Sequence, residues 1–108
     1  LVWVEMTDNT RMVTNTWGID EPQGPPISTP PAVWIIPALA VDADGYRLGQ
    51  GGGFYDRSLA QRPSDDNTLV IAVIVEDESV MHVPHEAHDQ RVDVVVTPER
   101  VRWLSMPD

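Results

Sequence analysis

Apolar and β-branched residues gather in four short runs, each bounded by Asp, Asn, Gly or Pro, which is typical of strands separated by turns. The runs occupy residues 1–6, 33–37, 69–75 and 92–97. Within them, the stretches 34–36 and 70–75 are apolar at every position. A strand with one exposed face would alternate, whereas a strand buried in a parallel sheet is apolar on both faces. The pattern therefore predicts a mostly parallel sheet with covered faces.

The segments between these runs predict the connections. Residues 54–61 follow a glycine run and precede a polar loop, which indicates a short helix. Strand, helix and strand form a βαβ unit, whose crossover is expected to be right-handed. Residues 20–31 hold five prolines in twelve positions and predict an extended linker with little regular hydrogen bonding. The Asp44-Gly45 pair predicts a tight hairpin turn, whereas a calcium loop would need further ligands that are absent.

Length and composition limit the class of protein. The chain has 108 residues, enough for one hydrophobic core, so we expect a single domain over 1–108. Hydrophobic residues make up 42% and charged residues 22%, which excludes wholesale disorder. The net charge is −10, so generic nucleic-acid binding is disfavoured. All seven basic residues are Arg, and therefore no lysine Schiff base or phosphate-loop lysine is available.

Cysteine content and apolar length narrow the class further. The chain has no Cys, which excludes disulfides, thiolate zinc sites and cysteine nucleophiles. The longest apolar run, 32–41, is about half of what spans a bilayer, and no signal segment opens the chain. We therefore expect a soluble, cytoplasmic protein with no membrane partner. The chain begins at Leu1 and runs directly into a predicted strand, so we also expect a fragment.

The stretch from Arg47 to Arg57 carries the strongest chemical signal. Four of the five residues 49–53 are glycine, directly before the predicted helix. Such a stretch lets the backbone approach a ligand and turns several N–H groups toward it, a geometry that suits phosphate. It matches neither standard nucleotide fingerprint, because the Walker lysine and the distal acidic residue of the dinucleotide pattern are missing. A flexible glycine turn is the alternative.

Two flanking side chains favour the phosphate interpretation. Arg47 can present a bidentate fork to phosphate oxygens, and Asp56 lies in the first helical turn, where it could hold magnesium. Taken singly, the Arg could be a solvated surface residue, and the Asp could merely complement the helix dipole. A cation, a cradle of N–H donors and a metal-type carboxylate close together predict a nucleoside triphosphate site.

These residues resemble the signature of the 5-formyltetrahydrofolate cyclo-ligase family, also called methenyltetrahydrofolate synthetase. The resemblance is carried by residues 37–42 (PALAVD), Gly45, 47–57 (RLGQGGGFYDR) and Leu59. It extends on both sides to Trp17-Gly18-Ile19, Glu21-Pro22, Val83-Pro84, His88-Asp89, Val92-Asp93 and Val95-Val96-Thr97. It covers essentially the whole chain.

The resemblance implies an ATP-dependent ring closure. In this family the N5-formyl oxygen of 5-formyltetrahydrofolate takes the γ-phosphoryl group of ATP, N10 closes onto the activated carbon, and phosphate leaves to give 5,10-methenyltetrahydrofolate. The implied partners are ATP and 5-formyltetrahydrofolate, with Mg²⁺ as cofactor. The implied fold is a three-layer α/β/α arrangement with a mostly parallel sheet, similar to the ribose-phosphate isomerase and CoA-transferase group. We expect the ligand site outside the carboxyl ends of strands 33–37 and 69–75.

The resemblance also implies site residues. Arg47 and Tyr55 would be catalytic, and Asp56 and Asp89 would hold magnesium. The residues lining the ATP phosphates would be Arg47, Leu48, Gly49, Gln50, Gly51, Gly52, Gly53, Phe54 and Tyr55. Those also touching the folate would be Gln50, Gly51, Gly52, Gly53 and Phe54.

Two departures from the family pattern bear on function. Members are roughly twice this length, and their N-terminal half supplies a Lys and an Arg for ATP and part of the folate pocket. We therefore expect this chain to be the C-terminal part of the domain, needing that half or a second chain. Phe54 stands where members often carry Tyr, which removes a hydroxyl and keeps the stacking face. The alternative function is a non-catalytic module that binds a nucleotide or a partner.

Other conspicuous residues receive simpler interpretations. His82, His85 and His88 could form a transition-metal cluster, but Pro84 disfavours a helix that would place them on one face. The acidic residues 76–78 are expected in a solvated turn. The predicted core includes Trp3, Trp34 and Trp103.

Overall fold

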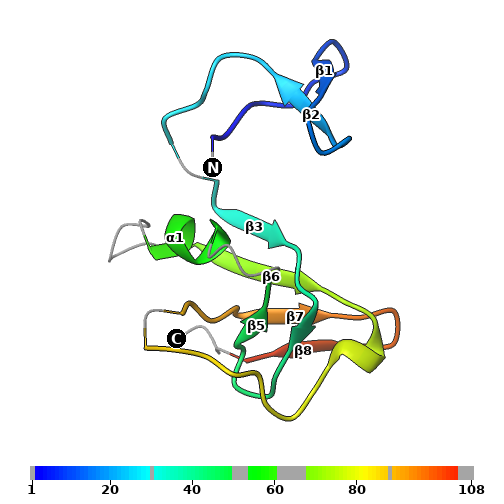
Figure 1. Ribbon diagram of the computed structural model, residues 1–108, viewed down its shortest axis with the longest axis vertical. Coiled ribbons are helices and arrows are strands. Elements are labelled where there is room, and N and C mark those ends of the chain that lie inside the picture. The colour runs from blue at the N-terminus through cyan, green and yellow to red at the C-terminus, as the bar shows by residue number, and fades with distance from the viewer. Residues whose placement is uncertain (1, 30, 50–53, 61–67, 88, 105–108) are drawn as a thin grey trace. The chain divides into compact units, whose positions relative to one another are not determined.

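The computed structural model describes residues 2–29, 31–49, 54–60, 68–87 and 89–104. Contacts divide the chain into two compact units, Leu1–Pro30 and Pro31–Asp108. Figure 1 labels most of their elements.

The first unit is built on an antiparallel hairpin. Strands β1 (Arg11–Thr14) and β2 (Asp20–Gln23) pair with Thr14 opposite Asp20. Asn15 shapes the turn between them, because its side-chain oxygen accepts hydrogen bonds from the amides of Trp17 and Ile19. Two expectations were wrong here. The start of the proline-rich linker is a strand, and residues 1–6 form no strand among those described, only an isolated bridge between Val4 and Pro26.

A four-stranded sheet forms the centre of the second unit. Its strands are β3 (Val33–Ile36), β6 (Leu69–Val73), β7 (Val94–Val96) and β8 (Val101–Trp103), in the order β3-β6-β7-β8. The β3–β6 and β6–β7 pairs are parallel, and β8 joins antiparallel. The sheet is therefore mixed, with the predicted parallel strands at one side (Figure 1).

The connection from β3 to β6 holds a hairpin and a helix. The hairpin strands are β4 (Ala40–Val41) and β5 (Arg47–Leu48), and the helix α1 spans Phe54–Ala60. Figure 1 shows the hairpin in front of the strands of the larger sheet. Gly45 takes the positive φ of 93° that the predicted turn needs. The tight turn and the strand–helix–strand unit are thus confirmed.

One face of the sheet is more deeply buried than the other, on which Val94 is buried but Ile35, Val73 and Val101 are exposed. Alternation along the strands places Trp34, Ile36, Val70, Ala72 and Val95 on the buried face. They pack with Val41 of the hairpin and Leu59 of α1 into the core, all nearly inaccessible to solvent.

The tryptophans and acidic residues differ in part from expectation. Trp34 is buried, with its indole N–H donating to the carbonyl of Pro31, but Trp103, at the end of the edge strand β8, is half exposed. Trp3 is half-buried in the first unit. The acidic trio forms a short 3₁₀ helix, η1 (Glu76–Glu78), in which Glu76 pairs with Arg100. Among the described residues, no helix is both long and apolar enough to cross a membrane.

Candidate functional site

Arg47 lies where strand β3 ends. Arg47 belongs to β5, which pairs antiparallel with β4, so Arg47 lies close to the residues at the start of the hairpin. Its Nη1 atom donates a hydrogen bond of 3.2 Å to the carbonyl of Pro37, the residue directly after β3. This is the carboxyl end of a parallel strand, the edge at which open α/β sheets bind ligands. Arg47 therefore lies at the edge where the ligand site is expected, and its role there stays a prediction.

The Arg47 side chain is held on three sides. Its guanidinium carbon lies 5.2 Å from the centre of the Tyr55 ring, a cation–π distance. A Cβ atom at Gly49 would lie 3.0 Å from Nη1, so only glycine leaves the guanidinium this space. The Nε atom is buried and has no hydrogen-bond partner among the described residues. A buried donor without a partner costs about 1–3 kcal/mol, so a ligand oxygen there would be favourable.

The two proposed metal ligands come from neighbouring segments. Asp56 is in the first turn of α1, and its Oδ1 accepts a 3.2 Å hydrogen bond from the amide of Gln90. Gln90 directly follows Asp89, so the contact ties the start of α1 to the loop that carries the second carboxylate. Asp89 in turn accepts a hydrogen bond from the amide of Glu86 at 2.9 Å. The structure thus brings together two segments whose carboxylates are 33 residues apart in the sequence, and their joint role in holding magnesium stays a prediction.

The structure describes only some of the remaining predicted site residues. Leu48 is in β5 beside Arg47 and is exposed. Phe54 is the first residue of α1, and only its backbone is described. Outside the described residues altogether are Gln50, Gly51, Gly52, Gly53 and His88.

Asp42 is a buried carboxylate whose importance the sequence did not reveal. Its Oδ1 accepts hydrogen bonds from the amides of Asp44 and Tyr46, and its Oδ2 accepts one from Val83, each 2.9–3.0 Å long. Burial would raise the pKa of Asp42, but these three donors and the nearby His82 outweigh it, so the pKa is lowered from its ordinary value. The residue therefore locks the hairpin turn to the loop that follows η1.

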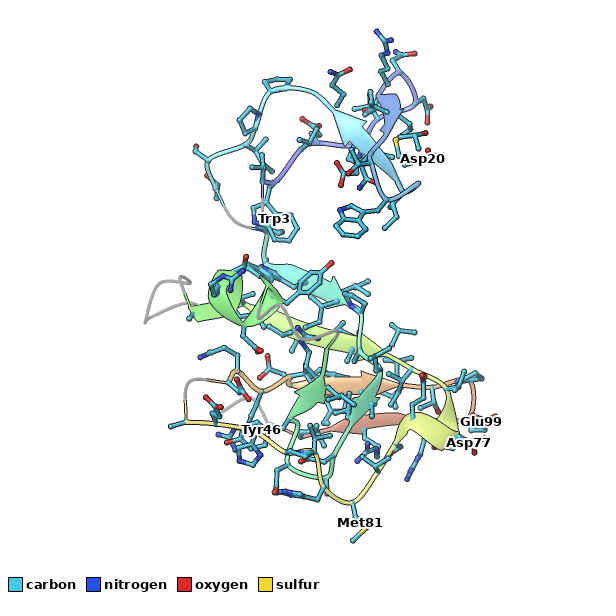
Figure 2. The ribbon with its side chains drawn as sticks, viewed as in Figure 1. Trp3, Asp20, Tyr46, Asp77, Met81 and Glu99 are labelled. Carbon is cyan, nitrogen blue, oxygen red and sulfur yellow. The ribbon has the colours of Figure 1, made fainter. Side chains whose placement is uncertain are left out.

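Two histidines lie beside this carboxylate. Potential ligand atoms of Asp42, His82 and His85 all fall within 4.8 Å of one another. His85 stacks on Tyr46 with ring centres 3.5 Å apart, and its Nδ1 bonds the carbonyl of Val83 (Figure 2 labels Tyr46). The histidine cluster considered from the sequence is thus partly assembled, without any helix. Because three amides already bind the carboxylate, its burial is explained without a metal.

Comparison with known proteins identifies the family. A family model described as the 5-formyltetrahydrofolate cyclo-ligase family matches residues 1–98. The chain belongs to this family. The residues of the Arg47 site therefore lie within a cyclo-ligase family domain, as the motif implied.

Individual relatives agree with this assignment. A 5-formyltetrahydrofolate cyclo-ligase of Mycolicibacterium smegmatis is 42% identical over 93 residues, covering 82% of this chain and 47% of the relative. A probable 5-formyltetrahydrofolate cyclo-ligase of Schizosaccharomyces pombe is 30% identical over 112 residues, covering 90% and 55%.

A solved structure shares the fold. It is the NMR structure of Aquifex aeolicus 5,10-methenyltetrahydrofolate synthetase, 32% identical, with a TM-score of 0.72 over 94% of this chain and 51% of that one. The chain thus spans about half the length of the proteins it matches.

Proposed function

We propose that these residues form part of a 5-formyltetrahydrofolate cyclo-ligase that uses ATP to make 5,10-methenyltetrahydrofolate. The observation that carries the proposal is the guanidinium of Arg47, which lies at the carboxyl end of β3 against Tyr55 and Gly49. Its buried Nε has no partner within the part of the chain that the structure describes. A fixed planar fork at a strand end suits phosphate oxygens. Family membership supplies the reaction.

The chemistry requires positioning and charge neutralisation. The formyl oxygen attacks the γ-phosphorus, ADP leaves, N10 adds to the activated carbon, and the C–O bond to the phosphate then breaks. Phosphoryl transfer depends on alignment and on neutralising charge at the transferred group. Arg47 supplies a permanent cation and directional donors, and Tyr55 fixes the plane of that cation. Residues 47–55 are proposed to line the ATP phosphates, and residues 50–54 also to touch the folate.

Magnesium is the cofactor that fits the second part of the site. Asp56 and Asp89 offer hard carboxylate oxygens, the ligands that Mg²⁺ prefers. Each accepts a backbone amide bond on one oxygen, which orients the carboxylate. When bound, the ion would neutralise phosphate charge during transfer. We also propose that the complete domain has the three-layer α/β/α arrangement. In support, α1 and the hairpin already cover one face of the described sheet.

Isosteric substitutions test the proposal in a polypeptide that joins these residues to the rest of a family-length domain. Asp56→Asn and Asp89→Asn should each lower the rate of methenyl product formation by about 100-fold or more, because an amide cannot replace a metal-binding carboxylate. The melting temperature should change little, because Asn keeps an oxygen acceptor for the amide bonds. Asp77→Asn in η1 is the matched control (labelled in Figure 2).

The possible results distinguish a magnesium-dependent ligase from a non-catalytic nucleotide-binding module. Near-normal rates in both site variants would contradict the magnesium assignment. Binding of Mg-ATP without product from the joined protein, measured by calorimetry and absorbance, would instead support a non-catalytic nucleotide-binding module. If the joined protein neither binds Mg-ATP nor forms product, both the ligase proposal and the nucleotide-binding alternative are wrong.

A further inference from the structure

A buried carboxylate and two exposed histidines meet beside the hairpin turn. The potential ligand atoms of Asp42, His82 and His85 all lie within 4.8 Å of one another. Two ligands of one tetrahedral Zn²⁺ ion, each about 2.0–2.2 Å from the metal, are about 3.3–3.5 Å apart. His82 is exposed, so a rotation of its side chain would bring the three groups to that spacing. Histidine nitrogen and carboxylate oxygen are both ligands of divalent transition metals.

The carboxylate of Asp42 is already fixed and charged. Its Oδ1 accepts two amide hydrogen bonds, from Asp44 and Tyr46, whereas its Oδ2 accepts one, from Val83. A carboxylate oxygen has two lone-pair positions, so one position on Oδ2 is not used by these bonds. Although burial opposes it, the amide donors lower the pKa of Asp42, and the group is ionised at neutral pH. The amides explain why the carboxylate can be buried, but they do not explain why two histidines gather beside it.

His85 has the surroundings that a metal-binding histidine usually has. Its Nδ1 lies 3.0 Å from the carbonyl oxygen of Val83, an acceptor, so the ring proton belongs on Nδ1. The lone pair of the neutral ring is then on Nε2, where a metal can bind. Metal-binding histidines almost always donate their other ring N–H to a carbonyl or carboxylate in this way. The ring also stacks on Tyr46, with ring centres 3.5 Å apart and planes at 5°, which limits its rotation (Figure 2 labels Tyr46).

Val83 holds the loop with the two histidines against the hairpin. Its side chain is 2% exposed, its amide donates to Asp42, and its carbonyl accepts from His85. The histidines therefore flank an anchored residue, although no helix or strand relates them. Ligands that are held by packing and by such hydrogen bonds need little rearrangement when an ion arrives.

We propose that Asp42, His82 and His85 form a binding site for a divalent transition metal of the Zn²⁺ type. Three protein ligands leave a fourth position for water or another ligand. None of the residues proposed to hold magnesium belongs to this site, and its nitrogen ligands suit Zn²⁺ better than Mg²⁺. A bound ion would connect the β4–β5 hairpin to the loop after η1, and it would stabilise the folded state by mass action.

Titration of Zn²⁺ into a metal-free, family-length protein tests the site. With Mg²⁺ in excess to occupy sites made of oxygen ligands alone, calorimetry should show one Zn²⁺ per chain whose binding raises the melting temperature. His82→Ala and His85→Ala should each weaken this binding about tenfold or more, because each removes a ligand. These variants are preferable to a substitution of Asp42, since both histidines are exposed and Asp42 is part of the buried hydrogen-bond network.

Three controls separate the loss of a ligand from a disturbed loop or an altered charge. Met81→Ala changes an 88% exposed neighbour of His82, and Glu99→Gln removes an exposed carboxylate elsewhere (both positions are labelled in Figure 2). Asp56→Asn alters the proposed magnesium site instead. We expect all three variants to bind Zn²⁺ as tightly as the unaltered protein.

The results either support the metal site or overturn it. Weaker binding in both histidine variants, with the controls unchanged and all proteins equally folded by circular dichroism, supports it. If the unaltered protein binds no Zn²⁺, the proposal is wrong, and His82 is only an electrostatic partner of Asp42. Unchanged affinity in His82→Ala and His85→Ala also overturns it, as does binding that is lost in Asp56→Asn. None of these measurements involves ATP or folate, so they are independent of the proposed reaction.

Discussion

The guanidinium of Arg47 lies over the ring of Tyr55, 5.2 Å from its centre, although the two residues belong to different elements. The strand β5 supplies the Arg and the helix α1 supplies the Tyr, with the glycine run between them. The aromatic face fixes the orientation of a side chain that would otherwise have many rotamers. The cation is therefore already oriented before any ligand arrives.

Arg47→Lys tests whether the planar fork matters beyond its charge. In a family-length protein, we expect kcat/KM to fall by about 100-fold, because Lys keeps a point charge but loses the bidentate geometry. Arg11→Lys in the exposed strand β1 is the control. Rates are followed by methenyl absorbance and folding by calorimetry. An unchanged kcat/KM would show that only the positive charge is needed.

Gly49→Ala should displace the guanidinium. The new Cβ would lie 3.0 Å from Nη1 and 3.3 Å from Nη2, so the side chain must shift by a few tenths of an ångström. We expect kcat/KM to fall about tenfold, since small misplacements of aligned groups are costly. Gly24→Ala is the matched control. Its new Cβ would lie 3.2 Å from Cγ1 of Val4, a similarly close contact, but in the first unit and not in the unit that holds Arg47. Equal effects of the two variants would argue against a specific role for Gly49.

Asp42→Asn should destabilise the fold. An amide can accept on one atom only, so its NH₂ group would face an amide donor, either that of Val83 or those of the turn. We expect a loss of about 1–3 kcal/mol in the free energy of unfolding, measured by urea denaturation at neutral pH. A loss within experimental error would show that the three hydrogen bonds contribute little.

The pH dependence of that loss has a definite sign. The pKa of Asp42 is lower in the folded than in the unfolded protein, so its ionised form stabilises the fold at neutral pH. This contribution should decline as the pH falls below the ordinary Asp value and vanish below the lowered folded pKa. The stability difference between wild type and Asp42→Asn should therefore narrow in acid. A constant difference across that range would contradict the ionic role.

Gly45→Ala should cost more than Gly18→Ala. Both glycines have positive φ, at 93° and 79°. A Cβ at Gly45 would lie 2.8 Å from the carbonyl oxygen of Val92, whereas one at Gly18 would meet nothing within 4 Å. We expect about 1 kcal/mol at Gly18 from backbone strain alone and about 2 kcal/mol or more at Gly45. Thermal melts of both variants provide the comparison, and equal losses would exclude the clash.

Local patterns predicted some elements and missed others for physical reasons. The strands β3, β6 and β7 are continuous apolar runs, and the hairpin carries an Asp-Gly turn, so each was visible in the sequence. The strands β1 and β2 are exposed at most positions, and β2 contains Pro22, so no hydrophobic periodicity marked them. Trp103 was assigned to the core because it is a large aromatic residue, and the sequence does not show which positions of a sheet are covered.

The helical position of Asp56 was predictable because a compact motif carried it. Asp56 follows a glycine run, and its place in the first turn of α1 agrees with the short helix expected after that run. The bond between Asp42 and Val83 joins residues 41 apart and leaves no local signal beyond a turn. The meeting of His82 and His85 with Asp42 is likewise tertiary, since no regular element relates them.

The tryptophans divide evenly between the two compact units, and this makes the chain its own optical probe. Trp3 and Trp17 belong to the first unit, where Trp17 is 85% exposed, whereas Trp34 and Trp103 belong to the second. Single-tryptophan versions would therefore report separately on each unit during unfolding. Trp103, which is 49% exposed, would also shift its emission to the blue if that side of β8 became covered, so fluorescence can detect such a change without a label.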